Sequence, residues 1–427
     1  MSEPVILRGL GQRLRLAESA HGLRDVKGGT DCGGLMRQLK GLVPIILIGV
    51  MGNSVIYLIP LLVGGMVSDR GFSEQQAGFM ASADLGGYAV ATFLTALILD
   101  RFSWRRMAIG ALVVMLIANV ATTFIYRPDS FALIRFASGL GSGVLAAIAS
   151  VSVGQTDNPE RNYGLLIGAA LLFGTAGLWG LPSLLDRFGL NSAYWLLAVL
   201  AALVFLLAIR IPNGRVTRGQ TNVAAPRSIW LWSGVVLLAI LLFWAEQNDV
   251  YAYIERIGNA AGIKPEFIGF SLGVANLMGF VGASLVAWLG TRMGRLVPLV
   301  VATLLQLACL VVLMGNLSPM TYLVGLGVLA LAWNIANPFQ LGVLAGIDPS
   351  GRALALATTV TGAGLALGPA MAAVAIGVGG YSAVLWLGGA LAVLSLALVL
   401  PPERAVARQL RAGWVKGLVV ASPPDTV

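Results

Sequence analysis

Four ionisable side chains lie inside long apolar runs of this 427-residue chain: Asp84, Arg135, Glu246 and Asp249. Ionisable groups in such surroundings are costly and usually functional. Arg135 keeps its proton at any accessible pH and therefore needs a partner. That partner could be Asp84 or the carboxylate of a bound solute. A pair with Asp84 could be purely structural, or it could open when a solute or a proton arrives.

Glu246 and Asp249 lie three positions apart, which places both on one face of a helix. Two neighbouring carboxylates resist ionising together, and burial adds to this effect. Such a pair suits the reversible binding of protons. The alternative is that the helix ends early and both acids face an outer vestibule. We predict Asp84, Glu246 and Asp249 as proton-coupling residues.

Uncharged polar and aromatic side chains gather in some of the same runs. Asn334 and Asn337 share a helix face, as do Asn53 and Tyr57. Such groups could form hydrogen bonds between helices, but we favour a role in lining a cavity, because polar groups are otherwise avoided at this depth. The aromatic residues could be ordinary packing residues or a stacking surface for a solute. The predicted solute-binding residues are Asn53, Tyr57, Arg135, Trp244, Asn248, Trp333, Asn334 and Asn337.

The composition identifies the solvent around these residues as lipid. The chain is 57% hydrophobic and 11% charged, whereas a soluble domain carries about 25% charged residues. Runs of roughly 20 apolar residues can cross a bilayer as helices. An all-α membrane protein with twelve transmembrane helices is expected, at residues 42–66, 75–99, 107–126, 131–154, 164–185, 192–209, 229–253, 266–289, 296–314, 320–343, 354–377 and 381–400.

Histidine and cysteine are too scarce for most metal chemistry. His21 is the single histidine, and the cysteines are Cys32 and Cys309. Zinc and di-iron sites built from His and Cys are therefore excluded, and a Ser-His-Asp triad is disfavoured. We expect no cofactor, no metal site and no enzymatic activity.

The second half of the chain repeats the first at a shift of 191 residues. Without a gap, Gly71 falls on Gly262 and Arg101 on Arg292. Such a repeat predicts two pseudo-symmetric six-helix bundles with a site between them. The expected segments are a disordered cytoplasmic tail at 1–35, bundles at 36–209 and 229–401, a cytoplasmic linker at 210–228 and a cytoplasmic tail at 402–427.

The shift fails at the buried charges. Asp84 falls on Ala275 and Arg135 on Leu326. The two halves have therefore diverged where we expect the solute and the proton to bind.

Lysine and arginine predict the orientation. With both termini in the cytoplasm, 22 of the 28 basic residues fall in cytoplasmic segments and five in outer loops. This asymmetry follows the positive-inside rule. It also explains the net charge of +9 through anionic lipid head groups, without nucleic acid as a partner.

The segment 96–106 reads Ala-Leu-Ile-Leu-Asp-Arg-Phe-Ser-Trp-Arg-Arg. It resembles the signature loop of the major facilitator superfamily, Gly-x-x-x-Asp-Arg-x-Gly-Arg-Arg, although Ala96 and Ser103 replace the two glycines. The pattern recurs at 287–295, where Thr291 replaces the acid. A further stretch, Arg135-x-x-x-Gly139-x-Gly141-x-Gly143, is similar to the family's Arg-plus-glycine motif.

This resemblance covers residues 40–401 and implies two bundles that alternate between inward- and outward-open states. It also implies that the signature loops contribute to gating, while simple anchoring of the helix ends is the alternative. The predicted gating residues are Asp100, Arg101, Arg105, Arg292 and Arg295.

The sequence therefore predicts a monomeric, multi-pass secondary transporter of a bacterial inner membrane. Its expected partners are a small organic solute, protons and membrane lipids. We favour proton-coupled uptake, with an organic anion at Arg135 as one option. The segment Gly180-Leu-Pro182 departs from the family's antiporter motif, which argues against export. The alternatives are proton-driven efflux of drugs or metabolites, and a solute sensor that does not transport.

Overall fold

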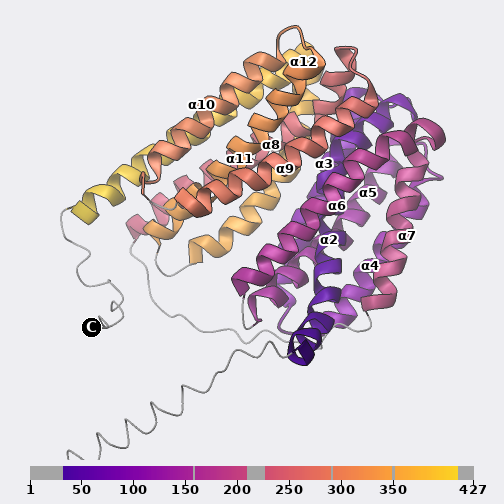
Figure 1. Cartoon of the computed structure of the whole chain (residues 1–427), viewed down its shortest axis with the longest axis horizontal. Coiled ribbons are helices and arrows are strands. Elements are labelled where there is room, and N and C mark those ends of the chain that lie inside the picture. Colours follow the sequence, from indigo (N-terminus) through magenta and orange to yellow (C-terminus); the bar gives the residue numbers. More distant parts are fainter. Residues whose placement is uncertain (1–31, 157–158, 209–226, 290–291, 349–351, 412–427) are drawn as a thin grey trace, which may run out of the picture. The chain divides into compact units, whose positions relative to one another are not determined.

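The computed structural model describes residues 32–156, 159–208, 227–289, 292–348 and 352–411, so most of the predicted linker and most of both predicted tails lie outside it. Within these residues all regular structure is helical (Figure 1). The helices are α2 Cys32–Ser68, α3 Glu74–Ile98, α4 Trp104–Thr122, α5 Pro128–Gly154, α6 Pro159–Phe188, α7 Leu190–Ala208, α8 Arg227–Ala260, α9 Pro265–Leu289, α10 Leu296–Leu313, α11 Pro319–Ile347 and α12 Arg352–Arg411.

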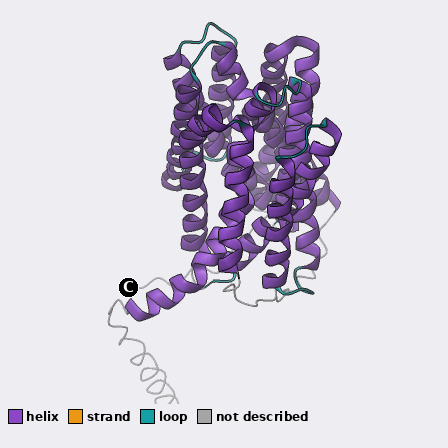
Figure 2. Ribbon diagram, turned by 90° about the vertical axis from the view of Figure 1, so that its right-hand side faces the viewer, coloured by secondary structure: helices purple, strands orange, loops and turns teal. Residues whose placement is uncertain are grey.

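From Pro44 onward the described residues belong to one compact unit, and the start of α2 lies outside that unit. Within the larger unit, the loops gather at the two ends of the helices (Figure 2). We call these the Glu74 end, which holds the loops before α3 and α9, and the Asp100 end, which holds the loops after those two helices.

Local sequence signals fix where several helices begin. The Ser73 hydroxyl accepts a hydrogen bond of 3.1 Å from the Gln76 amide, and the Ser73 amide donates one of 2.9 Å to the Gln76 side chain. This reciprocal capping satisfies two backbone groups that the first turn leaves open. Ser318 caps α11 in the same way. Pro128 and Pro319 occupy first helical positions, where a missing N–H costs nothing.

Eleven helices of the described chain are long and apolar enough to cross a membrane. The last candidate, Leu356–Arg404, has 49 residues, a length of roughly 74 Å at 1.5 Å per residue. That exceeds twice the bilayer core of about 30 Å. The backbone leaves the helix at Gly379 and at Gly380, whose φ is 63° and ψ is −156°. The count of twelve spans stays a prediction, which this break in α12 supports.

The 191-residue repeat extends to the helix boundaries. It lays the bounds of α3 on those of α9. It also lays Gly189, which separates α6 from α7, on Gly380, which interrupts α12. Both glycines have positive φ, 67° and 63°. The two segments of α12 therefore correspond to α6 and α7.

Glycines let α5 pack closely between α3 and α4. A Cβ atom at Gly139 would overlap the backbone oxygen of Asp84 on α3. One at Gly141 would lie 2.8 Å from the backbone oxygen of Ala111 on α4. Small residues are the usual means of close helix packing in membranes, and here they bring the Arg135 turn of α5 against the Asp84 turn of α3.

Candidate functional site

A cavity with about 710 Å³ of empty space, part of it open to solvent, lies between α2, α8, α9 and α11. Its wall combines helices from both sequence halves, as the repeat predicted. Four of the predicted solute-binding residues line it, namely Tyr57, Asn248, Trp333 and Asn334. The complete lining is Ile56, Tyr57, Gln247, Asn248, Tyr251, Ile254, Leu272, Ala275, Asn276, Gly279, Leu326, Leu329, Ala330, Trp333 and Asn334. None of these described lining residues is acidic or basic.

Ring packing and a hydrogen bond fix the aromatic side chains that line the cavity. The Trp244 ring packs edge-on against Trp333, with ring centroids 5.4 Å apart and an interplanar angle of 84°. Trp244, predicted as a solute ligand, therefore supports Trp333 and is not part of the wall. The Tyr251 hydroxyl donates a hydrogen bond of 2.8 Å to the Tyr57 backbone oxygen, which joins α8 to α2.

The amide side chains of the wall are oriented by backbone carbonyls. The Asn248 amide nitrogen donates to the Trp244 carbonyl at 3.0 Å. The Asn334 nitrogen donates to the Ala330 carbonyl at 2.9 Å. Asn276, which sequence reasoning did not select, donates to the Leu171 carbonyl at 3.0 Å. Each of these bonds uses one N–H and leaves the amide oxygen as an acceptor, and Asn276 also donates to the Thr175 hydroxyl at 3.2 Å.

Two predicted ligands lie outside the cavity wall. Asn53 donates to the Gly49 carbonyl at 2.8 Å and accepts from the Tyr88 hydroxyl at 3.2 Å, so it links α2 to α3. Asn337 is half-buried on α11 and does not line the cavity. The hydrogen-bonding alternative describes Asn53 better than cavity lining does.

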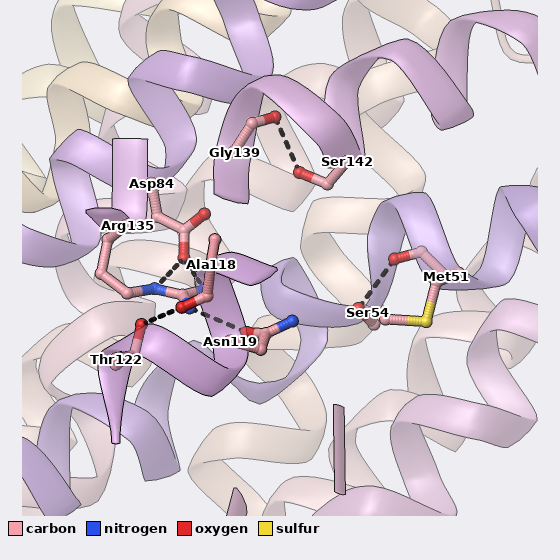
Figure 3. A network of polar contacts seen from close by, with 9 residues as sticks. All are labelled: Met51, Ser54, Asp84, Ala118, Asn119, Thr122, Arg135, Gly139 and Ser142. Atoms are coloured by element: carbon pink, nitrogen blue, oxygen red, sulfur yellow. Dashed lines mark hydrogen bonds and ion pairs between the residues drawn. The ribbon is translucent and has the colours of Figure 1, made fainter. Parts of the chain in front are cut away.

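Arg135 forms the centre of a buried network (Figure 3). Its Nε donates to Asp84 Oδ2 at 2.9 Å, and its Nη2 forms an ion pair with the same oxygen. Its Nη1 donates to Asn119 Oδ1 at 2.9 Å. The guanidinium carbon lies 4.8 Å from the centre of the Tyr194 ring. Asp84 is thus the partner of Arg135, as one of the two sequence-based options proposed, and the solute cavity does not include Arg135.

The acidic pair lies on the other side of α8 from the cavity wall. Glu246 and Asp249 are both 0% exposed. Glu246 accepts a hydrogen bond from the neighbouring Gln247 side chain. Asp249 faces the second segment of α12, where a Cβ atom at Gly388 would lie 3.3 Å from its Oδ1. Because α8 continues to Ala260, these acids do not open onto a vestibule at an early helix end.

The predicted gating residues lie at the Asp100 end. Arg101 is exposed, and both Asp100 and Arg105 are half-buried and engaged by neighbours. The Arg292 guanidinium carbon lies 6.0 Å from the centre of the Trp288 ring. Arg295 Nη1 lies 3.8 Å from Glu403 Oε2, which links the start of α10 to the end of α12. A gating role for all five residues stays a prediction.

Sequence reasoning missed a set of contacts at the Glu74 end, which we call the Glu74 clasp: Glu74, Tyr253, Arg256 and Tyr381. Arg256 Nη2 lies 3.0 Å from Glu74 Oε1. The Tyr381 hydroxyl donates to the same oxygen at 2.5 Å, and the Tyr253 hydroxyl donates to the Glu74 backbone oxygen at 2.7 Å. The clasp joins α3 of the first half to α8 and α12 of the second. The three partners of Glu74 lie about 180 to 310 positions from it in the sequence, and no local motif marks them.

A cavity between two related helical halves, with ionisable groups buried beside it, defines an α-helical membrane transporter. The model of the Major Facilitator Superfamily matches residues 43–349. The chain belongs to this family, and the resemblance found in its loops is confirmed.

Individual proteins agree with this assignment. The chain is 23% identical over 330 residues to a putative niacin/nicotinamide transporter, NiaP, of Bacillus subtilis, which covers 73% of this chain and 80% of the relative. It is 24% identical over 256 residues to an uncharacterized MFS-type transporter, YcaD, of Escherichia fergusonii, covering 58% of this chain and 64% of that protein.

Two solved structures show the same fold. A peptide transporter POT in complex with sulfate has a TM-score of 0.70 at 16% identity, covering 86% of this chain and 95% of that one. The nucleoside transporter NupG has a TM-score of 0.68 at 12% identity, covering 87% and 98%. The chain is a multi-pass membrane transporter of the major facilitator type, and this family consists of transporters and not of enzymes.

Proposed function

We propose that this protein takes up a small organic solute together with protons, by alternating access across a bacterial inner membrane. The observation that carries the proposal is one turn of α8, Glu246-Gln247-Asn248-Asp249. Its two amides line the solute cavity, while its two acids are fully buried beside it. A change in the charge of the acids would therefore act directly on the helix turn that contacts the solute.

The acids suit proton binding because the protein does not neutralise them. Among the described residues neither acid forms an ion pair, and no side chain donates a hydrogen bond to Asp249. A buried carboxylate without a counter-ion is stable only when a proton or another cation neutralises it. By contrast, Asp84 already has Arg135 as its counter-ion. We therefore propose Glu246 and Asp249, in preference to Asp84, as the coupling residues.

An organic anion bound by Arg135 is not part of this proposal. Arg135 is 0% exposed, and three of its nitrogens are engaged by Asp84 and Asn119. The described residues that line the cavity include no basic group. Monomeric assembly and contact with anionic lipid remain part of the proposal from the sequence.

The test is accumulation into proteoliposomes under an imposed pH gradient, acidic outside. Suitable solutes are nicotinamide, nicotinate, a nucleoside and a dipeptide, the kinds of compound that similar transporters are named for. We expect uptake above the equilibrium level for at least one of them. Glu246→Gln and Asp249→Asn should abolish this accumulation but retain exchange of labelled for unlabelled solute.

Glu266→Gln is the matched control, because Glu266 is an exposed acid in the first turn of α9. It should accumulate solute like the unmodified protein. Depletion of preloaded solute by the same gradient would show efflux and overturn the proposed direction. Accumulation that survives both buried-acid substitutions would overturn the coupling assignment.

A further inference from the structure

We infer that the solute of the central cavity is an uncharged, planar aromatic compound that carries N–H donors. This inference rests on the proposed function, because it names the class of compound that the same cavity would carry. Three independent properties of the wall support it: its charge, its aromatic surface and its free acceptors.

The described residues that line the cavity carry no formal charge. Of the charged residues near it, Arg135 is paired with Asp84, and Glu246 and Asp249 lie on the other side of α8. Arg135 is neutralised by Asp84 within the first half. Where the first half has these two residues, the repeat places Leu326 and Ala275, and both line the cavity. An ionic solute would lose its hydration there without gaining a counter-ion, which is a large penalty.

The aromatic surface has a fixed orientation. Trp333 lines the cavity, and the ring of Trp244 packs edge-on against it. Tyr57 and Tyr251 contribute two further rings from α2 and α8. Aromatic rings prefer other rings in offset-stacked or edge-to-face contact. A flat ring system therefore gains more from this wall than an aliphatic solute of equal size.

The amides present acceptors toward the cavity. Asn248, Asn276 and Asn334 each use the amide nitrogen for a carbonyl of the protein, at 2.9 to 3.0 Å. The amide oxygens remain as acceptors, and Asn248 and Asn334 each keep a second N–H, so the complementary solute donates N–H groups and also accepts. A primary carboxamide on a ring both donates and accepts, whereas a carboxylate, which only accepts, leaves the amide oxygens of the wall without a donor.

The test measures binding by isothermal titration calorimetry, with the full chain in lipid nanodiscs at pH 7. Nicotinamide, nicotinate and 1-methylnicotinamide share one ring and differ in charge as neutral, anionic and cationic. Adenine and cytosine extend the neutral set. We expect an uncharged member to bind at least about tenfold more tightly than either ion. Tighter binding of an ion, or no binding by any uncharged member, overturns the inference.

Charge placed in the wall gives a second, independent test. Asn334→Asp should weaken binding of the neutral compound and strengthen that of 1-methylnicotinamide, each by about tenfold, because the new carboxylate supplies the missing counter-ion. Asn248→Asp tests the same point from α8 if the first variant does not fold. Asn316→Asp, in an exposed loop, is the control and should change neither. An unchanged preference in both wall variants would contradict the inference.

The aromatic claim has its own pair of variants. Trp333→Ala should weaken binding by roughly 2- to 12-fold, while Trp386→Ala, at a ring that is 67% exposed on α12, should not. Binding of a neutral ring without any transport would reject the proposed function and keep the solute class. Transport restricted to charged solutes would keep the function and reject the class.

Discussion

Removal of the charge on Asp84 should destabilise the first half of the protein strongly. Asp84→Asn leaves the guanidinium of Arg135 fully buried with only neutral partners, Asn119 and the ring of Tyr194. Breaking a buried ion pair by removing one partner costs about 3–5 kcal/mol. Asn119→Ala removes a single hydrogen bond to a charged group and should cost about 1.5–3 kcal/mol. The double variant Asp84→Asn with Arg135→Gln removes both charges and should lose less stability than Asp84→Asn alone.

The assay is unfolding of the purified protein by SDS in mixed micelles, followed by far-ultraviolet circular dichroism. The unmodified protein, Asp84→Asn, Arg135→Gln and the double variant form a double-mutant cycle. It gives the coupling energy between the two side chains, which we expect to be about 3 kcal/mol. The double variant should also retain solute binding, since neither residue lines the cavity. Additive losses, or an Asp84→Asn protein as stable as the unmodified one, would refute the structural role. If a stable double variant lost solute binding, that result would instead indicate that Arg135 contributes to the solute site.

Three further predictions concern the helix ends and the helix contacts. Ser82 lies on α3, and its hydroxyl donates to the Ala366 carbonyl of α12 at 2.6 Å. In a background without native cysteines, Glu74→Gln should raise maleimide labelling of Ser82→Cys by up to about fivefold, because partly exposed ion pairs contribute up to about 1 kcal/mol. Unchanged labelling would mean that the clasp does not hold α3 against α12. Gly380→Ala should lower the unfolding free energy by about 1–3 kcal/mol, since only glycine readily adopts its φ of 63° and ψ of −156°, and equal stability would contradict that reasoning. Gly139→Ala should disrupt the fold because its Cβ would overlap the backbone of Asp84, whereas Gly110→Ala, where a Cβ meets nothing within 4 Å, should be neutral in the same SDS unfolding assay. Two equally stable proteins would show that close α3–α5 packing is not required.

The sequence predicted the fold class, and it limited the partner of Arg135 to two options, of which Asp84 was one, because both conclusions follow from large energies. An apolar composition excludes water as the solvent, and a buried arginine must have a partner. These constraints leave few alternatives, so the helical membrane fold and the family could be identified from composition, the repeat and the loop motifs.

The side chains that face the cavity were harder to predict, because helix rotation depends on packing. Asn334 and Asn337 lie three residues apart, which differs from a full turn by about 60°. Only Asn334 lines the cavity. In the same way Gln247 and Asn248 line it while Glu246 and Asp249 do not. Spacing alone did not separate Asn334 from Asn337, because the packing of the neighbouring helices decides which side chains reach the cavity.

Contacts between distant helices left almost no trace in the sequence. Asn119 binds Arg135 from α4, and a polar residue in an apolar run was the one available signal. The Glu74 clasp joins residues that lie next to loops, where charges are expected in any case. Only the packing of α3 against α8 and α12 shows that Glu74 and Arg256 meet.

The most direct measurement is the current produced when an uncharged solute is added to proteoliposomes on a solid-supported membrane, with equal pH on both sides. Since the solute has no charge, any charge that moves with it belongs to the coupled ion. Proton-coupled uptake predicts a transient that carries positive charge in the direction of the solute and disappears in Glu246→Gln and Asp249→Asn. Solute transport without current, or a current of opposite sign, would contradict it.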